Sequence, residues 1–445
     1  MAPPGNQAAN GENKPQPVAS EETGLLDSIN LSINQGDRLI ALQPKASPRE
    51  YLAITIGAIV WVMLVDYFTN TLPPHWDGCD YIFIATEGII GNKHLIAPFA
   101  YVPGIPFVAR GLADLAHIPI ASAFEILIRL GAVSLIVLAF ALAHRFTHSF
   151  WHAAVPAAAI ACTAPHVKYP LFLTAFIDGA TYPIMLAAML ALVSNRVALC
   201  MIIAGVGILF KEFLAVPLAL LMLSVFLQYL KTREPKDAAL LVGIGALTAF
   251  MAIAPRALIP VEKSFQDIEP FKCPPDLRGL LQNPRNMHRN LNIAHAFVSY
   301  WLPTLMLITP GRLKNIWHDL APWRLMLIAY LGLIAFLTMY GGQNLYFFVG
   351  YALAAQIIIL ATMTNCKMHR YEFVCLFVAL IVYNKIFLRI PLPEEGFYRF
   401  VDFYGCWSSR VSIQTLARFA EALLYILLAV LVRRFAAQAS RPQQS

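Results

Sequence analysis

The stretch "AALLVGIGALTAFMAIAP", residues 238–255, contains no charged side chain and no break before its final proline. As an α-helix its 18 residues rise about 27 Å, close to the ~30 Å hydrocarbon core of a bilayer. Strands of a membrane barrel would alternate polar and apolar residues over about 10 positions, which this stretch does not do. It therefore predicts a membrane-spanning helix.

Similar apolar stretches recur along the whole chain. The approximate cores of about twelve predicted spans are 51–71, 121–143, 152–165, 172–194, 197–210, 213–230, 238–255, 294–309, 323–340, 345–363, 371–388 and 414–432. The third and the fifth are short for a complete crossing. We expect an all-α fold, a polytopic membrane bundle of about twelve transmembrane helices.

The composition agrees with a membrane protein. Hydrophobic residues make up 58% of the 445 residues, charged residues only 13%, and the mean hydropathy is +0.61. Soluble proteins carry about 25% charged residues. The net charge of +7 does not indicate nucleic-acid binding, because the Lys and Arg residues are spread over short loops where membrane topology explains them. We expect membrane lipids as partners and no nucleic acid.

Basic residues in short loops predict the orientation, since such loops stay on the cytoplasmic side. They flank alternate spans: Lys45, Arg49, Arg145, Arg196, Lys231, Arg233, Lys236, Arg312, Lys314, Lys367, Arg370, Arg433 and Arg434. Both termini are then cytoplasmic. The expected organisation is a disordered tail (1–46), a transmembrane domain (47–434) with long outer loops at about 72–120, 256–293 and 389–413, and a short C-terminal tail (435–445).

The first outer loop carries three carboxylates close to its start, Asp77, Asp80 and Glu87. If this segment is helical, as we expect, all three side chains share one face. A carboxylate at the membrane boundary that faces a protein cavity suits a general base for an acceptor hydroxyl. The alternative is a solvated interfacial loop whose acids only pair with Arg110 or Lys93.

A second charged group interrupts two apolar runs in "LFKEFLAVP", residues 209–217. Charges held so close to membrane segments are costly unless they are buried in protein or face water, so Lys211 and Glu212 are functional candidates. Lys211 suits a phosphate, and Glu212 suits either the orientation of that lysine or a sugar hydroxyl. The alternative is a hairpin turn with an internal ion pair.

Two further candidates have a favoured structural interpretation. Asp178 opens the fourth span, where a carboxylate caps free N–H groups and suits the helix dipole. Glu125 and Arg129 are four residues apart in the second span and predict an intrahelical pair, although Arg129 also suits an anionic substrate. The aromatic turns 340–347 and 394–410 predict either stacking on sugars or an interfacial belt.

Four segments together resemble the GT-C superfamily of membrane glycosyltransferases, which use polyprenyl-phosphate sugars, and in particular its mannosyltransferase-like and arabinosyltransferase-like members. They are "WDGCDYIFIA" after the first span, "APFAYVPGIPFVARGLA" before the second, "FIDGATYPIMLAAMLAL" at the fourth and "GILFKEFLAVPLALL" at the hairpin. Order and spacing agree over roughly residues 50–230. Val102, Gln343 and Leu345 stand where related sequences often carry charges.

The resemblance implies an inverting transfer on the outer face of a bacterial inner (plasma) membrane of the cell envelope. It assigns the catalytic base to Asp77 or Asp80, and it implies that Lys211, Arg110 or the basic 256–293 loop holds the donor phosphate. The donor is a polyprenyl-phosphate-linked sugar that enters from the bilayer, and the acceptor is a glycan, lipid or protein. No other cofactor is expected, and a divalent metal requirement stays open.

Two other classes of protein fit the same pattern of charges. A transporter or lipid flippase would open a water path to both faces, whereas the enzyme has a cavity open to the outer side and to lipid. A catalytically silent relative would tolerate the loss of both aspartates. The clustering of charges at helix ends rather than at mid-membrane depth favours the enzyme.

Overall fold

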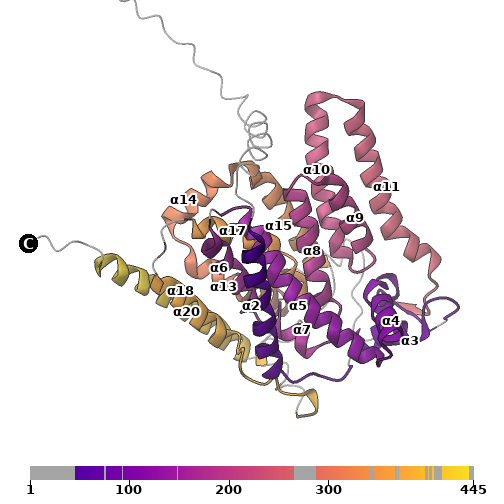
Figure 1. The fold of residues 1–445 in the computed structure, drawn as a ribbon, viewed down its shortest axis with the longest axis horizontal. Helices are drawn as coiled ribbons and strands as arrows, with labels where there is room; N and C mark the ends of the chain where they lie inside the picture. The colour runs from indigo at the N-terminus through magenta and orange to yellow at the C-terminus, as the bar shows by residue number, and fades with distance from the viewer. Residues whose placement is uncertain are drawn as a thin grey trace, which may run out of the picture.

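The computed structural model describes residues 46–74, 77–92, 94–147, 149–264, 287–340, 345–365, 368, 370–395, 399, 403–404 and 413–439. Helices build almost all of this part of the chain (Figure 1). The elements are α2 (Pro48–Tyr67), α3 (Asp77–Glu87), β1 (Ile96–Ala97), η2 (Phe99–Tyr101), α4 (Gly104–Ala116), α5 (Ile120–His144), α6 (Phe150–Ala161), α7 (Lys168–Phe172), α8 (Asp178–Val193), α9 (Val197–Gly207), η3 (Glu212–Leu214), α10 (Ala215–Thr232), α11 (Pro235–Leu258), β2 (Lys263–Ser264), α13 (Met287–Leu307), α14 (Pro310–Asp319), η6 (Ala321–Trp323), α15 (Arg324–Tyr340), α16 (Leu345–Gly350), α17 (Leu353–Thr364), α18 (Arg370–Tyr383), η7 (Pro393–Glu395) and α20 (Ile413–Ala439).

The prediction of an all-α polytopic bundle is confirmed, with a helix at each of the twelve predicted cores. Fewer of these helices than expected are full spans. Within the described ranges, six helices are long and apolar enough to cross a membrane, or seven if α13 and α14, which bend by 99°, count as one span. Shorter helices such as α8 and α17 are buried between the longer ones. Irregular backbone is tolerated at membrane depth where protein surrounds it, so a buried helix need not match the bilayer.

The long outer helices turn apolar side chains outward. Leu52, Val60 and Met63 on α2 are exposed, as are Leu258 on α11 and Leu427 on α20. Large exposed apolar surfaces on helices of membrane length have only lipid to contact. The chain is an integral membrane protein.

Segments from all three predicted outer loops meet at one end of the bundle. The strands β1 and β2 pair in parallel and join the first loop to the segment after α11. Asn70 exchanges hydrogen bonds of 2.8 and 3.1 Å with the backbone of Ile390, and the Gly104 amide donates to the Leu209 carbonyl at 2.9 Å. We call this the α3 end; α14 lies at the opposite end, the α14 end (Figure 1).

The first outer loop is helical, as predicted, and glycines let it approach the bundle closely. A Cβ on Gly78 of α3 would lie 2.8 Å from the Cβ of Ala175, and one on Gly104 of α4 would lie 2.5 Å from the Phe210 ring. Atoms this close must move apart, so both positions need glycine. These contacts fix α3 against the segment before α8 and α4 against the turn after α9.

Candidate active site at the α3 end

The turn between α9 and α10 presents Lys211. The helix α9 ends at Gly207, whose carbonyl accepts hydrogen bonds from the amides of Phe210 at 2.8 Å and Lys211 at 3.0 Å. Lys211 itself is extended, with φ −166° and ψ 136°, and η3 starts at the next residue. The extended backbone at Lys211 separates α9 from η3, and the Lys211 side chain projects from this break between the two helical segments.

Lys211 pairs with Asp178 at the start of α8. Its Nζ lies 3.2 Å from Oδ1 of Asp178, and the side chains are only 12% and 4% exposed. The Lys211 ammonium also lies 5.5 Å from the centre of the Phe348 ring. The Tyr351 hydroxyl donates to Oδ1 of Asp178 at 2.9 Å. A buried cation is therefore held by a carboxylate that a second group orients.

This arrangement corrects two interpretations. Asp178 lies in the first turn of α8, but the N-cap position is Ile177 and no side chain caps the helix; the carboxylate is used by Lys211 and Tyr351 instead. The second interpretation, a hairpin turn in which Lys211 and Glu212 form an internal ion pair, is also wrong. Glu212 turns to Arg256 at the end of α11, with 3.6 Å between Oε1 and Nη2. Sequence spacing could not reveal either partner, because both come from distant helices.

The α3 helix brings a further acid and a tyrosine to this lysine. Tyr81 is buried, and its pKa is raised well above the usual value by burial and by the carboxylates of Asp77, Asp178, Glu212 and, least, Asp80. Carboxylates from three separate segments therefore act on one phenol.

Lys211 responds to the same acids. Burial alone would lower the pKa of Lys211, but Asp178, Glu212 and Asp77 raise it overall. An ammonium surrounded by carboxylates keeps its charge even where water is scarce. We call Asp77, Tyr81, Asp178, Lys211 and Glu212 the Lys211 cluster.

Asp80 lies beside the Lys211 cluster. It is half-buried on α3, and burial raises its pKa to about 6. It acts on Tyr81 more weakly than Asp77 does. Asp80 therefore holds a proton more readily than an ordinary aspartate, whereas Asp77 is the α3 acid whose charge acts on Lys211.

Arg110 and Glu87, two other predicted site residues, lie away from the Lys211 cluster. Arg110 on α4 donates from Nη1 to the Thr86 carbonyl at 3.2 Å and lies 3.9 Å from Asp114. Glu87 ends α3 as an exposed side chain. Arg110 thus ties the end of α3 to α4.

Arg129 also has a different role from a substrate contact. The predicted pair with Glu125 is present at 3.1 Å, but Arg129 also binds Asp66 of α2, with Nε 3.0 Å from Oδ2. The two carboxylates come from α2 and from the arginine's own helix, so the structure gives this guanidinium a structural role. The network joins α2 to α5.

Three side chains outside the predicted site residues lie close to Lys211 or at the same end of the bundle. Tyr351 and Tyr81 carry no distinguishing local signal, since tyrosines are frequent in this chain. Lys168 is fully buried, and its ammonium donates to the carbonyls of Lys385 and Leu388. As a charge beside an apolar run, Lys168 meets the same criterion that identified Lys211.

Several expectations fall outside the described residues. They are the tail 1–45, Lys93, Gln343, the part of the basic loop from 265 to 286, and most of 394–410. Within the ranges that the structure describes, no group of three or more His, Cys, Asp or Glu side chains is placed to hold a metal ion.

The fold and the charged cluster define a polytopic, all-α membrane protein with an acid–lysine site at one end of its bundle. No protein-family model and no curated protein matches the sequence. Among solved structures, the chain is similar to ArnT from Cupriavidus metallidurans bound to undecaprenyl phosphate, with a TM-score of 0.45, 14% sequence identity, and coverage of 87% of this chain and 77% of that one.

Proposed function

We propose that this protein is an integral membrane glycosyltransferase that transfers a sugar from a polyprenyl-phosphate donor to an acceptor hydroxyl. The observation that supports it is the Lys211 cluster. An acid from the helix after the first span and a buried lysine from a distant hairpin act on one another at the same end of the bundle. Such transfer needs a base toward the acceptor and a cation toward the leaving phosphate.

Lys211 is the proposed phosphate ligand. In the reaction, negative charge grows on the phosphate oxygen as its bond to the sugar breaks, and a fixed cation lowers that barrier. Asp178 and Tyr351 hold the lysine in place, since the tyrosine hydroxyl donates to the carboxylate that pairs with the ammonium. Because Lys211 is almost buried, its charge is little screened by water.

Asp77 is the proposed base. The acceptor oxygen attacks the anomeric carbon, the bond from that carbon to the phosphate oxygen breaks, and the acceptor proton passes to the Asp77 carboxylate. Polyprenyl phosphate leaves with the electron pair, and the sugar carbon is inverted. We favour Asp77 over Asp80 because the charge of Asp77 acts on Lys211, so an acceptor at Asp77 is close to the bound phosphate. Asp80, with a pKa of about 6, is the alternative base.

The surface of α4 supports entry of a lipid donor from the bilayer. Phe107, Val108 and Leu115 are exposed on this helix, while its first residue contacts the Lys211 turn through the Gly104 amide. An amphipathic helix with an exposed apolar face lies in the membrane interface. A donor whose prenyl chain stays in lipid therefore has its phosphate at the level of the cluster.

We further propose that the α3 end faces the outside of a bacterial inner membrane and that both termini are cytoplasmic. The basic residues at the α14 end, among them the half-buried Arg145 and the exposed Lys231 and Lys314, support this orientation. A membrane-impermeant maleimide should label the exposed Cys79 in spheroplasts. The Cys79→Ser variant should then carry one labelled site fewer than the wild type. If Cys79 is labelled only after the membrane is permeabilised, the α3 end faces the cytoplasm and the proposed orientation is wrong.

The transfer itself is tested with membranes that carry the full chain and with radiolabelled polyprenyl-phosphate sugars. Asp77→Asn removes the base and is expected to slow transfer by about 10²–10⁴-fold. Lys211→Ala is expected to slow it by about 10²–10³-fold. The control is Glu87→Gln, an exposed acid on the same helix, which should stay within about twofold of the wild type.

The outcome for Asp80→Asn separates the two acids. Transfer that survives in Asp80→Asn and fails in Asp77→Asn supports the assignment, and the reverse result moves the base to Asp80. Full transfer in the double variant excludes both acids as the base. A wild-type chain inert toward every donor would favour the silent relative or the transporter.

A further inference from the structure

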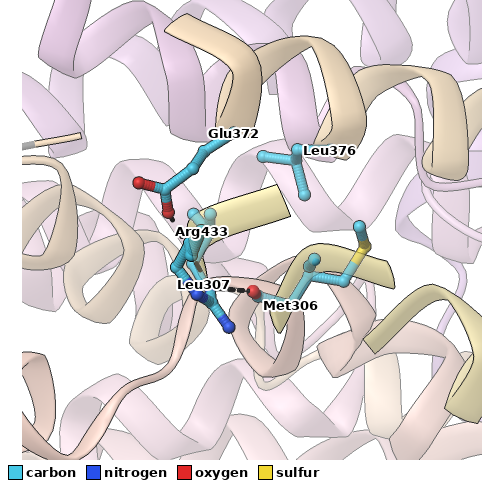
Figure 2. Close-up of a pocket in the computed structure, with 6 residues that line it drawn as sticks. Met306, Leu307, Glu372, Leu376 and Arg433 are labelled. Carbon is cyan, nitrogen blue, oxygen red and sulfur yellow. Dashed lines mark hydrogen bonds and ion pairs between the residues drawn. The ribbon is translucent and has the colours of Figure 1, made fainter. Parts of the chain in front are cut away.

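A buried group of charges lies at the α14 end, far from the Lys211 cluster. Arg312 of α14 forms a two-pronged pair with Glu372 of α18, at 2.7 Å from Nη1 to Oε2 and 2.9 Å from Nη2 to Oε1. Arg433 of α20 approaches the same carboxylate at 3.8 Å and donates from Nη1 to the Met306 carbonyl at 2.5 Å. Figure 2 shows Glu372 and Arg433 with the apolar side chains that line the adjoining pocket. We call Arg312, Glu372 and Arg433 the arginine triad.

The arginine triad holds one more positive charge than negative charge. Both oxygens of Glu372 are committed to Arg312 at hydrogen-bond distance, so Arg433 makes only the longer contact. Nε and Nη2 of Arg433 have no hydrogen-bond partner in the part of the chain that the structure describes, and the side chain is 14% exposed. These donors are not among the buried, unpaired atoms of the described residues, so they can reach a ligand at the protein surface.

Exposed aromatic residues show where this end meets the membrane surface. Tyr371 precedes Glu372, Trp317 lies on the same helix as Arg312, and Phe435 follows Arg433 by two residues; all three are exposed. Such aromatic belts lie at the level of lipid headgroups. The unused donors of Arg433 therefore lie at the depth where phosphates of the bilayer are found.

We infer that Arg433 binds the phosphate of an anionic glycerophospholipid in the leaflet at the α14 end. The guanidinium fork matches two phosphate oxygens, and basic pockets between membrane helices bind such headgroups. The apolar side chains of Met306, Leu307, Leu376 and Ala429 lie beside Arg433 and pack too closely to admit a headgroup between them, so the lipid would lie over them. Apolar walls next to the charge suit a lipid better than a free ion. The site is independent of the proposed transfer reaction.

The test is a titration of the purified full chain in mild detergent with phosphatidylglycerol, read by native mass spectrometry. Arg433→Gln should weaken binding of the first lipid about tenfold, the effect of one lost charge-assisted contact. The matched control is Arg434→Gln, the same charge change at the exposed neighbouring position, which should leave this affinity within about twofold. Zwitterionic phosphatidylcholine should bind more weakly and equally to all three proteins.

Three results would overturn the inference: unchanged phosphatidylglycerol affinity in Arg433→Gln, an equal loss in Arg434→Gln, or displacement of the lipid by millimolar inorganic phosphate, which would assign the site to the free ion. Thermal unfolding in the same detergent checks that each variant is folded. If Arg433→Gln does not fold, Arg433→Lys compared with Arg434→Lys serves instead. The first of these loses the guanidinium fork and should bind phosphatidylglycerol more weakly than the second.

Discussion

The buried pair of Lys211 and Asp178 is open to a double-mutant test. Asp178→Asn keeps the shape of the side chain and its ability to accept from Tyr351, but it removes the charge that lies 3.2 Å from the lysine. Breaking a buried pair by removing one partner costs about 3–5 kcal/mol. We expect the lower value, about 3 kcal/mol, because Asp77 and Glu212 also act on Lys211.

The second single variant and the double variant complete the cycle. Lys211→Met leaves Asp178 as a buried, uncompensated carboxylate and should be destabilised to a similar degree. In the double variant no buried charge of the pair is left, so its free energy of unfolding should return to within about 1 kcal/mol of the wild type. With single losses of about 3 kcal/mol each and a double loss of at most about 1 kcal/mol, the expected coupling energy is about 5 kcal/mol.

The measurement is denaturant unfolding of the full chain in detergent micelles, followed by tryptophan fluorescence, for all four proteins. A coupling energy below about 0.5 kcal/mol would refute the reasoning, since it would show that the two groups do not depend on one another. Sugar transfer gives a separate reading. The double variant folds but lacks the cation, so its transfer should stay as low as in Lys211→Ala; recovered transfer would contradict the phosphate role.

Four further variants test the surroundings of the cluster by the same unfolding measurement. Gly78→Ala puts a methyl group 2.8 Å from the Cβ of Ala175 and should lower the free energy of unfolding by about 1–3 kcal/mol, with a loss of transfer. Its control is Gly111→Ala on α4, where the methyl group meets no atom within 4 Å. That variant should be neutral or more stable by up to about 1 kcal/mol. The pKa of Asp80 is raised to about 6 from 3.8, so its contribution to stability is full below pH 4 and lost as the pH rises through 6. Asp80→Asn should therefore match the wild type at pH 4 and be about 1 kcal/mol more stable at pH 8. The full pKa shift would correspond to roughly 3 kcal/mol, but the carboxyl is only partly buried and solvent reduces the effect. Arg129→Gln should lower stability by about 1–2 kcal/mol and leave the donor KM unchanged, and a raised KM would return Arg129 to the substrate site.

Much of the fold follows from local pattern. Runs such as 238–255 are apolar over the length of a bilayer, so the positions of the helices are readable without a partner. Which helices are full spans was less readable. The helices α8 and α17 are apolar on all sides because they are buried in protein, and an apolar run surrounded by protein has the same composition as one surrounded by lipid.

The candidate site was only partly readable for the same reason. The membrane makes isolated charges rare, so Asp77, Lys211 and Asp178 stood out by type and position. Their partners did not. The pairing of Glu212 with Arg256 and the second carboxylate on Arg129 join residues that are tens of positions apart in sequence.

The sequence by itself determined that the chain is a helical membrane protein and which few charges lie at helix ends, because a bilayer penalises every polar group according to its position along a single segment. Only the tertiary structure decided that Asp77, Asp178 and Lys211 share one environment while Arg110 and Arg129 do not. Electrostatic interactions weaken with distance and are screened over about 10 Å, and distances of that size are set by how helices pack on one another.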